Sequence, residues 1–254
     1  MSEDLRGKTA VVFGASSGIG AAVARRFGEL GVSTLVHYNA NQDGAADVVE
    51  AIHAGGGKAA LSGGDVAKPD VAARIIDEAV AHFGRLDILV NNAGSMFGRT
   101  AIADITDAQY AKVIDVNIGG VFFAARKAAI IMKAQGSGTI INTTSIAARN
   151  GGGEGAGLYA SAKAFVSNLT RVLAKELAPF GVRVNGVAPG VILTPFHERY
   201  STAEQLEAAC RTIPMRRLGT SEDCVGAYEF LASERMSGYI TGQIIEVNGG
   251  QLMP

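Results

Sequence analysis

The segment YASAK contains the residues of this chain whose types and spacing most directly suggest acid–base chemistry. Tyr159 and Lys163 are four residues apart, so on a helix they share one face and lie one turn apart. An ammonium beside a phenol favours the phenolate, and the tyrosine could then exchange a proton closer to neutral pH than its free pKa of ~10 allows. Ser145, at the end of the segment GTIINTTS, could hold a substrate carbonyl against Tyr159. The three side chains predict proton transfer to or from a carbonyl or hydroxyl group, although an isolated tyrosine–lysine pair also arises by chance on solvated helices.

The glycine-rich segment GASSGIG, residues 14–20, allows two functional interpretations. Its glycines fit a strand-to-helix turn whose backbone N–H groups approach a dinucleotide pyrophosphate. Its first five residues also fit the G-x-S-x-G elbow of serine hydrolases, with Ser16 as the nucleophile. The elbow requires an acid and a histidine at later strand ends, and His197 is not accompanied by an acid in a distinctive context. We therefore favour the cofactor loop, and keep a serine hydrolase or a non-catalytic dinucleotide-binding protein as remote alternatives.

The elements that must position these residues follow from short β-branched runs that alternate with longer alanine-rich segments. Strands are expected at TAVVFG, STLVHY, within GGGKAALSGGDV, and at LDILVNNAG, GTIINTTS, VRVNGVAPG and GQIIEVNG. Helices are expected over residues 18–30, 44–54, 69–83, 106–135, 158–178 and 221–233.

The end signals of the two longest helices support these boundaries. Thr106 and Gln109 have the spacing of a capping box, and Gly181 suits a left-handed C-cap. The strand runs are apolar on both faces, as parallel strands covered by helices should be. The order predicts an α/β fold, a single doubly wound parallel sheet of the Rossmann type in one domain over residues 1–254, with a small helical substrate lid around 191–218.

The composition excludes several classes of protein. Hydrophobic residues make up 48% and charged residues 19% of the chain, which permits a sizeable core. The net charge is −1, so neither nucleic acid nor an anionic membrane is expected as the main partner. The two cysteines and four scattered histidines predict no metal site. Without a signal-like N-terminus or an apolar run of ~20 residues, a cytoplasmic location is expected.

Eight short motifs together carry a resemblance to a known family. They are GASSGIG (14–20), GGDV (63–66), NNAG (91–94), DVN (115–117), TTS (143–145), YASAK (159–163), VNGVAPG (184–190) and GYITGQIIEVNGG (238–250). In this order and spacing the chain resembles the short-chain dehydrogenase/reductase family over nearly its full length. It is most similar there to 3-oxoacyl-[acyl-carrier-protein] reductases and to sugar dehydrogenases such as glucose dehydrogenase.

The resemblance implies a role for each matching position. Tyr159 would be the acid/base, Lys163 would lower its pKa and bind the nicotinamide ribose, and Ser145 would orient the substrate. Asn117 would hold a water that links Lys163 to bulk solvent, unless it only caps or kinks its helix. The implied cofactor-binding residues are Gly14, Ser16, Ser17, Gly18, Ile19, Gly20, Tyr38, Asn39, Asp65, Val66, Asn91, Ala93, Gly94, Tyr159, Lys163, Pro189, Gly190, Ile192 and Thr194.

Three features depart from the family pattern. Phe13 stands where the family usually has a threonine, so a hydroxyl that normally ties the glycine loop is missing and local repacking is expected. The glycine-rich stretch between Ser145 and Tyr159 is one residue longer than is typical. Thr144 stands where a second serine is often found, which makes it the fallback for Ser145.

The identity of the cofactor depends on the end of the second predicted strand, LVHYNANQD. An acid there bonds the ribose of NAD and repels a 2′-phosphate, but the aligned position is Tyr38 and no acid occurs before Asp43. Ser17, Tyr38, Asn39 and Asn41 could hydrogen-bond a phosphate instead. We therefore favour NADP(H), with NAD(H) possible.

The expected reaction is reversible hydride transfer between the nicotinamide and a carbonyl or secondary alcohol. A 3-oxoacyl-thioester or small ketone reductase is favoured, and a sugar or polyol dehydrogenase is the alternative. Substrate choice is expected to depend on Met96, Phe97, the 146–157 loop and the lid. The basic lid residues His197, Arg199, Arg211, Arg216 and Arg217 either meet an anionic or polar substrate or form a solvated surface. The resemblance also implies a homotetramer.

Overall fold

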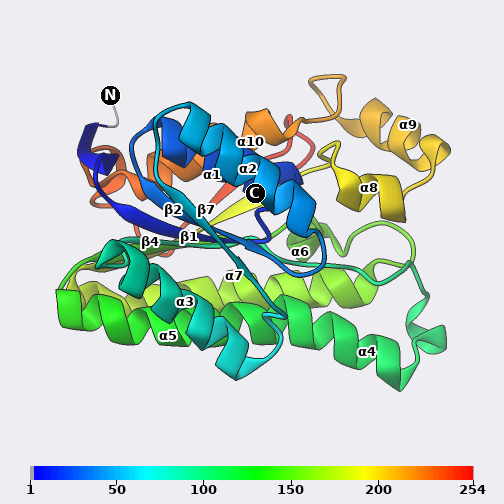
Figure 1. The fold of residues 1–254 in the computed structure, drawn as a ribbon. Helices are drawn as coiled ribbons and strands as arrows, with labels where there is room; N and C mark the ends of the chain where they lie inside the picture. The colour runs from blue at the N-terminus through cyan, green and yellow to red at the C-terminus, as the bar shows by residue number, and fades with distance from the viewer. Residues whose placement is uncertain (1–2, 254) are drawn as a thin grey trace.

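The chain folds around one seven-stranded parallel sheet (Figure 1). The structure is a computed structural model that describes residues 3–253. The strands are β1 (Thr9–Phe13), β2 (Ser33–Tyr38), β3 (Ala59–Gly63), β4 (Ile88–Asn91), β5 (Gly138–Thr143), β6 (Val182–Pro189) and β7 (Ile244–Val247). Their order is β3-β2-β1-β4-β5-β6-β7. The order of the strands across the sheet reverses between β1 and β4. In such sheets ligands bind in the crevice at this switch point.

Helices cover both faces of the sheet, as Figure 1 shows. Buried side chains join one face to α1 (Gly18–Glu29), α2 (Gln42–Ala54) and α10 (Ser221–Ala232). The other face packs against α3 (Pro69–Phe83), α5 (Gly120–Gln135) and α7 (Gly157–Leu177). Neighbouring residues of one strand, such as Val11 and Val12, belong to opposite cores, since successive side chains of a strand point to opposite faces. The doubly wound prediction is confirmed.

The helix expected over residues 106–135 is divided by a wider turn. It consists of α4 (Asp107–Ile114), a π-helical turn (Asp115–Gly119) and α5. π-helical turns are rare in proteins, and those that occur often lie at functional sites. This one contains Asn117. The expected capping box is only half formed, because Thr106 accepts from the backbone of Gln109 while the Gln109 side chain donates to Thr100.

The other helix boundaries agree with the sequence-based expectation or differ from it by a few residues. Helix α2 begins at Gln42 rather than 44, because Asn41 caps it by accepting from the backbone of Gly44 at 3.1 Å. Gly181 has φ 70°, the left-handed conformation expected after α7. A short helix, α6 (Ala147–Asn150), was not anticipated, and α11 (Glu234–Ser237) follows α10.

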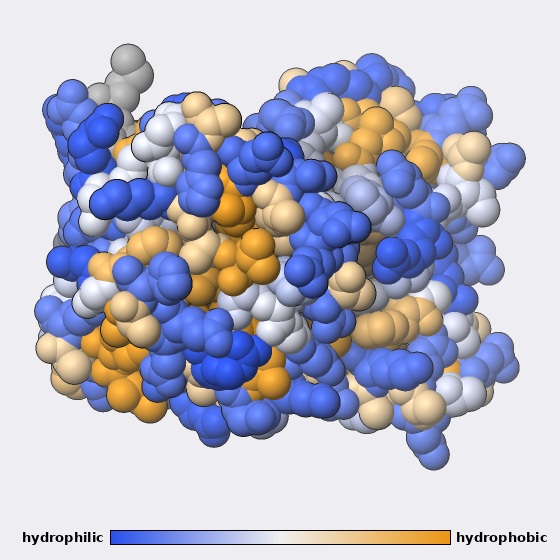
Figure 2. Space-filling view, viewed as in Figure 1, coloured by the Kyte–Doolittle hydropathy of each residue, from blue (hydrophilic) through white to orange (hydrophobic). Residues whose placement is uncertain are grey.

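Residues 191–218, which we call the lid, contain α8 (Pro195–Tyr200) and α9 (Ala203–Thr212). Both helices lie at one end of the molecule, outside the two layers that cover the sheet (Figure 1). In the space-filling view a notch separates the surface over the lid from that over α1 and α2 (Figure 2). None of the helices that the structure describes is long and apolar enough to cross a membrane.

Candidate active site

A cavity of about 930 Å³ opens at the carboxyl ends of the central strands, between the sheet and the lid. It brings together most of the residues selected from the sequence. Those that line it are Gly14, Ser16, Ser17, Gly18, Ile19, Asn39, Asp65, Val66, Ala93, Gly94, Ser145, Tyr159, Lys163, Pro189, Gly190, Ile192 and Thr194. Gly20, Tyr38, Asn91 and Asn117 do not line it. The structure thus places most of the predicted residues around one cavity, with these four residues outside its wall.

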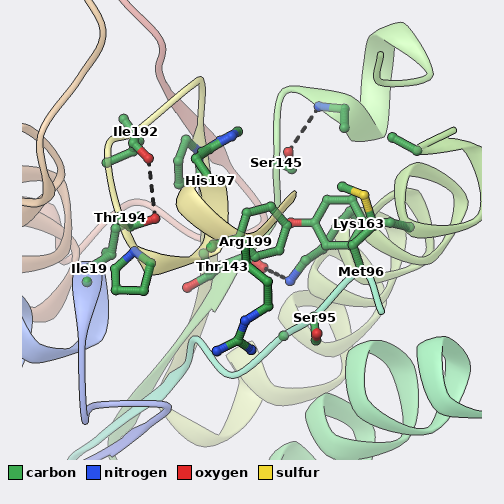
Figure 3. Close-up of a pocket in the computed structure, with 18 of the residues that line it drawn as sticks. Ile19, Ser95, Met96, Thr143, Ser145, Lys163, Ile192, Thr194, His197 and Arg199 are labelled. Carbon is green, nitrogen blue, oxygen red and sulfur yellow. Dashed lines mark hydrogen bonds between the residues drawn. The ribbon is translucent and has the colours of Figure 1, made fainter. Parts of the chain in front are cut away.

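Tyr159, Lys163 and Ser145 converge on the cavity from α7 and from the end of β5 (Figure 3). The Lys163 ammonium lies 5.7 Å from the centre of the Tyr159 ring and donates to the Thr143 carbonyl at 2.9 Å. The Ser145 hydroxyl is hydrogen-bonded to Tyr159. It also accepts from the backbone N–H of Ala147 at 3.1 Å, which fixes its direction. A hydroxyl, a phenol and an ammonium are therefore held around one point in the cavity.

Burial reverses the direction expected for the Tyr159 pKa. Burial raises the pKa of the phenol to about 12, and the hydrogen bond from Ser145 offsets only part of this effect. Burial also lowers the pKa of Lys163 to about 8, because its side chain is only 2% exposed. The structure therefore keeps Tyr159 protonated at neutral pH, while Lys163 remains mostly charged with a reduced affinity for its proton.

Asn117 is completely buried in the π-helical turn, and its side chain bonds only to backbone groups. Its amide donates to the carbonyls of Ser95 at 2.7 Å and Val113 at 2.8 Å, and its oxygen accepts from the Ser95 N–H at 3.3 Å. A Cβ placed on Gly94 would lie 2.9 Å from the Asn117 oxygen and 3.2 Å from the Lys163 nitrogen. Asn117 thus fixes the loop beside Lys163, and its expected contact with a water stays a prediction.

The glycine loop has the geometry that a bound pyrophosphate requires. Gly14 and Gly18 have φ values of 69° and 56°, in the left-handed region. A Cβ on Gly20 would clash with the Gly14 carbonyl, so Gly20 allows the close contact of α1 with the loop from beneath rather than forming the cavity wall. Helix α1 begins at Gly18 with no side-chain cap, so its N-terminal N–H groups can bind an anion. These residues fit a nicotinamide dinucleotide.

His37 holds this loop in place, a role that no motif in the sequence indicated. Its Nδ1 accepts from the Gly14 N–H at 3.1 Å, so its Nε2 is the donor to the Gly64 carbonyl at 2.8 Å. Its ring meets the edge of Phe13 with the centroids 5.0 Å apart. Burial lowers the pKa of His37 to about 4, which keeps the ring neutral and both bonds intact at pH 7. Phe13 and His37 pack together at the position where a threonine is usual, and the local repacking expected there stays a prediction.

Tyr38 is directed away from the cavity. Its ring lies against Gly63, where an added Cβ would come within 2.5 Å of it, and it packs on the core beneath α1 and α2. Asn39 and Asn41 form the wall at this position instead. Asn41 also donates to the Ser16 carbonyl at 3.3 Å, which ties the start of α2 to the glycine loop.

The two asparagines after β4 have different roles. Asn91 is buried and donates to Asn142 at 2.9 Å, so it joins neighbouring strands inside the sheet. Asn92 lines the cavity and donates to the Gly14 carbonyl at 3.0 Å. Either residue could have been chosen from the NNAG motif, because the alternation of a strand cannot be assigned from its last residues alone.

Aromatic side chains of the lid cover the reacting groups. The Phe196 ring lies 5.5 Å from that of Tyr159 and 5.1 Å from that of Tyr200. The Tyr200 hydroxyl shares a hydrogen bond of 2.7 Å with Ser95. Arg99, another residue that no motif in the sequence indicated, donates to the Tyr200 carbonyl at 2.5 Å and so fastens the lid.

His197 lines the cavity but does not act as a cation there. Burial and the nearby Arg99 charge lower its pKa to about 4, and its Nδ1 shares a hydrogen bond of 2.9 Å with Ser201. This histidine is therefore neutral at pH 7 and is bonded within its own helix end. In the part of the chain that the structure describes, no group of three or more His, Cys, Asp or Glu side chains could hold a metal ion.

Comparison with known proteins gives matches over the whole chain. The family model described as enoyl-(acyl carrier protein) reductase matches residues 14–251. A 3beta-hydroxysteroid dehydrogenase 1 of Eggerthella lenta is 40% identical, with 100% of this chain and 97% of that protein covered. A 3-oxoacyl-[acyl-carrier-protein] reductase of Synechocystis sp. is 39% identical (98% and 98%). The glucose 1-dehydrogenase 2 of Bacillus subtilis is 35% identical (100% and 98%).

Solved structures agree with the fold and with a nicotinamide cofactor. A short-chain type dehydrogenase/reductase from Mycobacterium marinum superposes with a TM-score of 0.93 at 37% identity, with 100% of this chain and 98% of that chain covered. The NADH-dependent reductase A1-R′ complexed with NAD gives 0.89 at 35% (100% and 100%). A putative NAD(P) dependent gluconate 5-dehydrogenase from Beutenbergia cavernae with bound NADP gives 0.91 at 36% (99% and 99%). The hydrolase alternative finds no support among these proteins.

Proposed function

The chain belongs to the short-chain dehydrogenase/reductase family of NAD(P)-dependent oxidoreductases, and from this premise we propose that it reduces a small ketone or a 3-oxoacyl thioester with Tyr159 as the proton donor. One observation carries the proposal: Ser145, Tyr159 and Lys163 meet in the cavity that the glycine loop also lines. A hydride donor and a proton donor can therefore act on one carbonyl.

Ser145, Tyr159 and Lys163 have different roles toward the substrate carbonyl. The Ser145 hydroxyl donates to the carbonyl oxygen and holds it near the phenol of Tyr159. The nicotinamide, when bound, supplies the hydride. Tyr159 then donates its proton to the oxygen as negative charge develops there, and its raised pKa ensures that it carries this proton at neutral pH. The charge of Lys163 stabilises the tyrosinate that remains.

The preference for NADP(H) is part of the proposal. The residues that line the cavity beside the glycine loop include Ser16, Ser17, Asn39 and Asn41, whereas Asp43 does not line it. No carboxylate at the end of β2 therefore repels a 2′-phosphate, and the N-terminus of α2 is close to Ser16. The bound nucleotides of similar proteins include both NAD and NADP.

A sugar or sugar-acid dehydrogenase is the second candidate. It is favoured by the similarity to a glucose dehydrogenase and to a putative gluconate 5-dehydrogenase. The two candidates use the same chemistry in opposite directions and differ in the substrate that the lid admits. The resemblance further predicts a homotetramer, which sedimentation of the purified protein would test, and cell fractionation would test the cytoplasmic location expected from the sequence.

A direct experiment tests both the cofactor and the reaction. NADPH and NADH would be titrated separately and followed by reduced-nicotinamide fluorescence. A panel of 3-oxoacyl thioesters, small ketones and keto sugars would then be tested with the tighter cofactor. We expect tighter NADPH binding and turnover of at least one ketone, both unchanged in the surface control Tyr110→Phe. Binding of neither nucleotide would contradict the proposal.

A further inference from the structure

The five basic side chains of the lid fall into two groups. His197 and Arg199 line the cavity, whereas the other three do not. Arg211 pairs with Glu207 at 2.8 Å, and Arg217 pairs with Asp223 at 2.6 Å. Arg216 donates to the Arg211 carbonyl at 2.9 Å. None of these three arginines lines the cavity. They form a solvated outer surface, as exposed lid charges ordinarily do.

Arg199 differs from them, because it lines the cavity and has no acidic partner among the described residues. It follows Phe196 by three residues on α8, so the two side chains lie on neighbouring parts of one helix face. Phe196 contacts the Tyr159 ring, so this face of α8 borders the cavity, and the Arg199 side chain lies at its solvent-exposed edge. Figure 3 shows the Arg199 guanidinium extending from α8, in this view toward the side where Ser95 lies.

Arg99 places a second positive charge at the same end of the cavity. Its guanidinium donates to the carbonyls of Tyr200 at 2.5 Å and Glu154 at 2.9 Å, and these neutral acceptors leave its charge uncompensated. Two carboxylates also line the cavity, Asp65 near the nucleotide-side residues and Glu154 on the exposed glycine-rich loop. Neither forms an ion pair with the two arginines in the described structure, so the substrate end has an excess of positive charge.

We propose that the substrate carries a carboxylate a few bonds from its reacting carbonyl, and that Arg199 binds this carboxylate. The proposal rests on the proposed function and narrows it to keto acids and their hydroxy-acid products. A guanidinium matches a carboxylate with two parallel hydrogen bonds, which fixes direction as well as position. With the carboxylate bound at Arg199, the carbonyl is presented to Ser145 and Tyr159. Arg99 acts on the lid as a positioning residue and adds to the attraction.

The experiment compares ketones that differ only in charge. Pyruvate, acetoacetate, levulinate and 5-oxohexanoate would each be assayed with NADPH beside their methyl esters, and kcat/KM would be compared for acid and ester. In the wild type we expect at least one acid to exceed its ester by about tenfold. Arg199→Gln should lose this tenfold preference for the acid, while its kcat/KM with the ester stays within about twofold of the wild-type value. Arg199→Lys should retain part of it, and Arg211→Gln, on the same lid, should retain all of it.

Ionic strength gives a second and independent readout. The kcat/KM of the preferred acid should fall as salt rises, whereas that of its ester should not, because only the acid is attracted by charge. Preference for the esters throughout, or a preference for acids that Arg199→Gln leaves unchanged, would overturn the assignment of Arg199. Turnover of no ketone by a protein that binds NADPH would instead overturn the proposed reaction, and with it this narrowing of the substrate.

Discussion

The floor of the cavity, formed by the strand ends and α7, is held by buried hydrogen bonds, whereas the lid is held mainly by partly exposed ones. On the floor, Lys163, Asn117 and His37 are all no more than 2% exposed and bond to backbone groups. On the lid, Arg211 and Arg217 form exposed ion pairs, which contribute little to stability. We infer that the floor determines the reaction and the cofactor, while the lid selects the substrate and can change without loss of the chemistry.

The largest effect is expected at Tyr159. Tyr159→Phe removes the proton donor but keeps the ring against Phe196, so turnover should fall about 10³-fold while the affinity for NADPH changes less than about threefold. Steady-state kinetics and fluorescence titration on the same preparation measure both quantities. Full turnover in this variant would remove Tyr159 from the mechanism.

Substitution of Lys163 should show that a residue of the floor needed for activity lowers the stability of the fold. Its folded pKa is lowered to about 8 from 10.5, so burial of its charged form costs about 3 kcal/mol at pH 7. Lys163→Met should therefore abolish turnover and yet raise the free energy of unfolding by up to this amount, less the lost bond to the Thr143 carbonyl. The wild type should gain stability relative to the variant as the pH rises from about 8 to 10.5, because the unfolded lysine binds the proton more tightly there. A stability difference that does not change with pH would contradict this cause.

Two glycine substitutions compare the loop with the outer surface. Gly20→Ala adds a methyl group against the Gly14 carbonyl and 2.6 Å from the Asn92 amide, so NADPH should bind at least tenfold more weakly. Gly226→Ala in α10 meets nothing within 4 Å and should leave binding unchanged while stabilising the fold by up to about 1 kcal/mol. Equal effects of the two substitutions on the Kd would show that the loop geometry does not matter.

Variants of His37 test whether its hydrogen bonds hold the glycine loop in place of the hydroxyl that is missing at position 13. His37→Phe leaves the Gly14 N–H and the Gly64 carbonyl without their partners, which should cost about 1–3 kcal/mol of stability and weaken NADPH binding several-fold. Because the folded pKa of His37 lies near 4, below its usual 6.5, the stability that it contributes is lost as the pH falls from about 6.5 to 4. His37→Asn, with a donor and an acceptor, should recover part of the affinity, and no recovery would argue against the hydrogen bonds as the cause.

The smallest effect on the chemistry is expected in the lid. Phe196→Ala removes apolar contact with Tyr159 and should raise KM several-fold with kcat nearly unchanged, as loss of uniform binding does. Measurement of both constants for one ketone decides the point. A loss of kcat as large as that in Tyr159→Phe would show that floor and lid do not have separate roles.

How much of this site could be predicted from the sequence also differs between the two regions. The strands, the glycine loop and the YASAK spacing have local signatures, so the sheet and the positions of Ser145, Tyr159 and Lys163 followed from them. The direction of the Tyr159 pKa did not, because it is set by burial, which outweighs the hydrogen bond with Ser145 and arises only once the fold surrounds the phenol. The roles of His37 and Arg99 depend on partners 23 and 101 residues away, and such contacts leave no local pattern.

The π-helical turn was missed for a related reason. The sequence around Asn117 is compatible with a continuous helix, and Gly119 and Gly120 permit but do not require a wider turn. Two hydrogen bonds between the Asn117 side chain and the Ser95 backbone, one donated by each residue, accompany this turn, and they exist only in the folded chain.

The most direct test of the account is to follow the hydride itself. The protein would be incubated with NADPH in which both hydrogens at C4 of the nicotinamide are replaced by deuterium and with the ketones of the panel, and the products analysed by mass spectrometry and NMR. We predict an alcohol with deuterium on the former carbonyl carbon, formed by the wild type and at least 100-fold more slowly by Tyr159→Phe. An alcohol without deuterium at that carbon, or no alcohol from any ketone by a protein that binds NADPH, would contradict the proposal that this cavity transfers a hydride to a carbonyl.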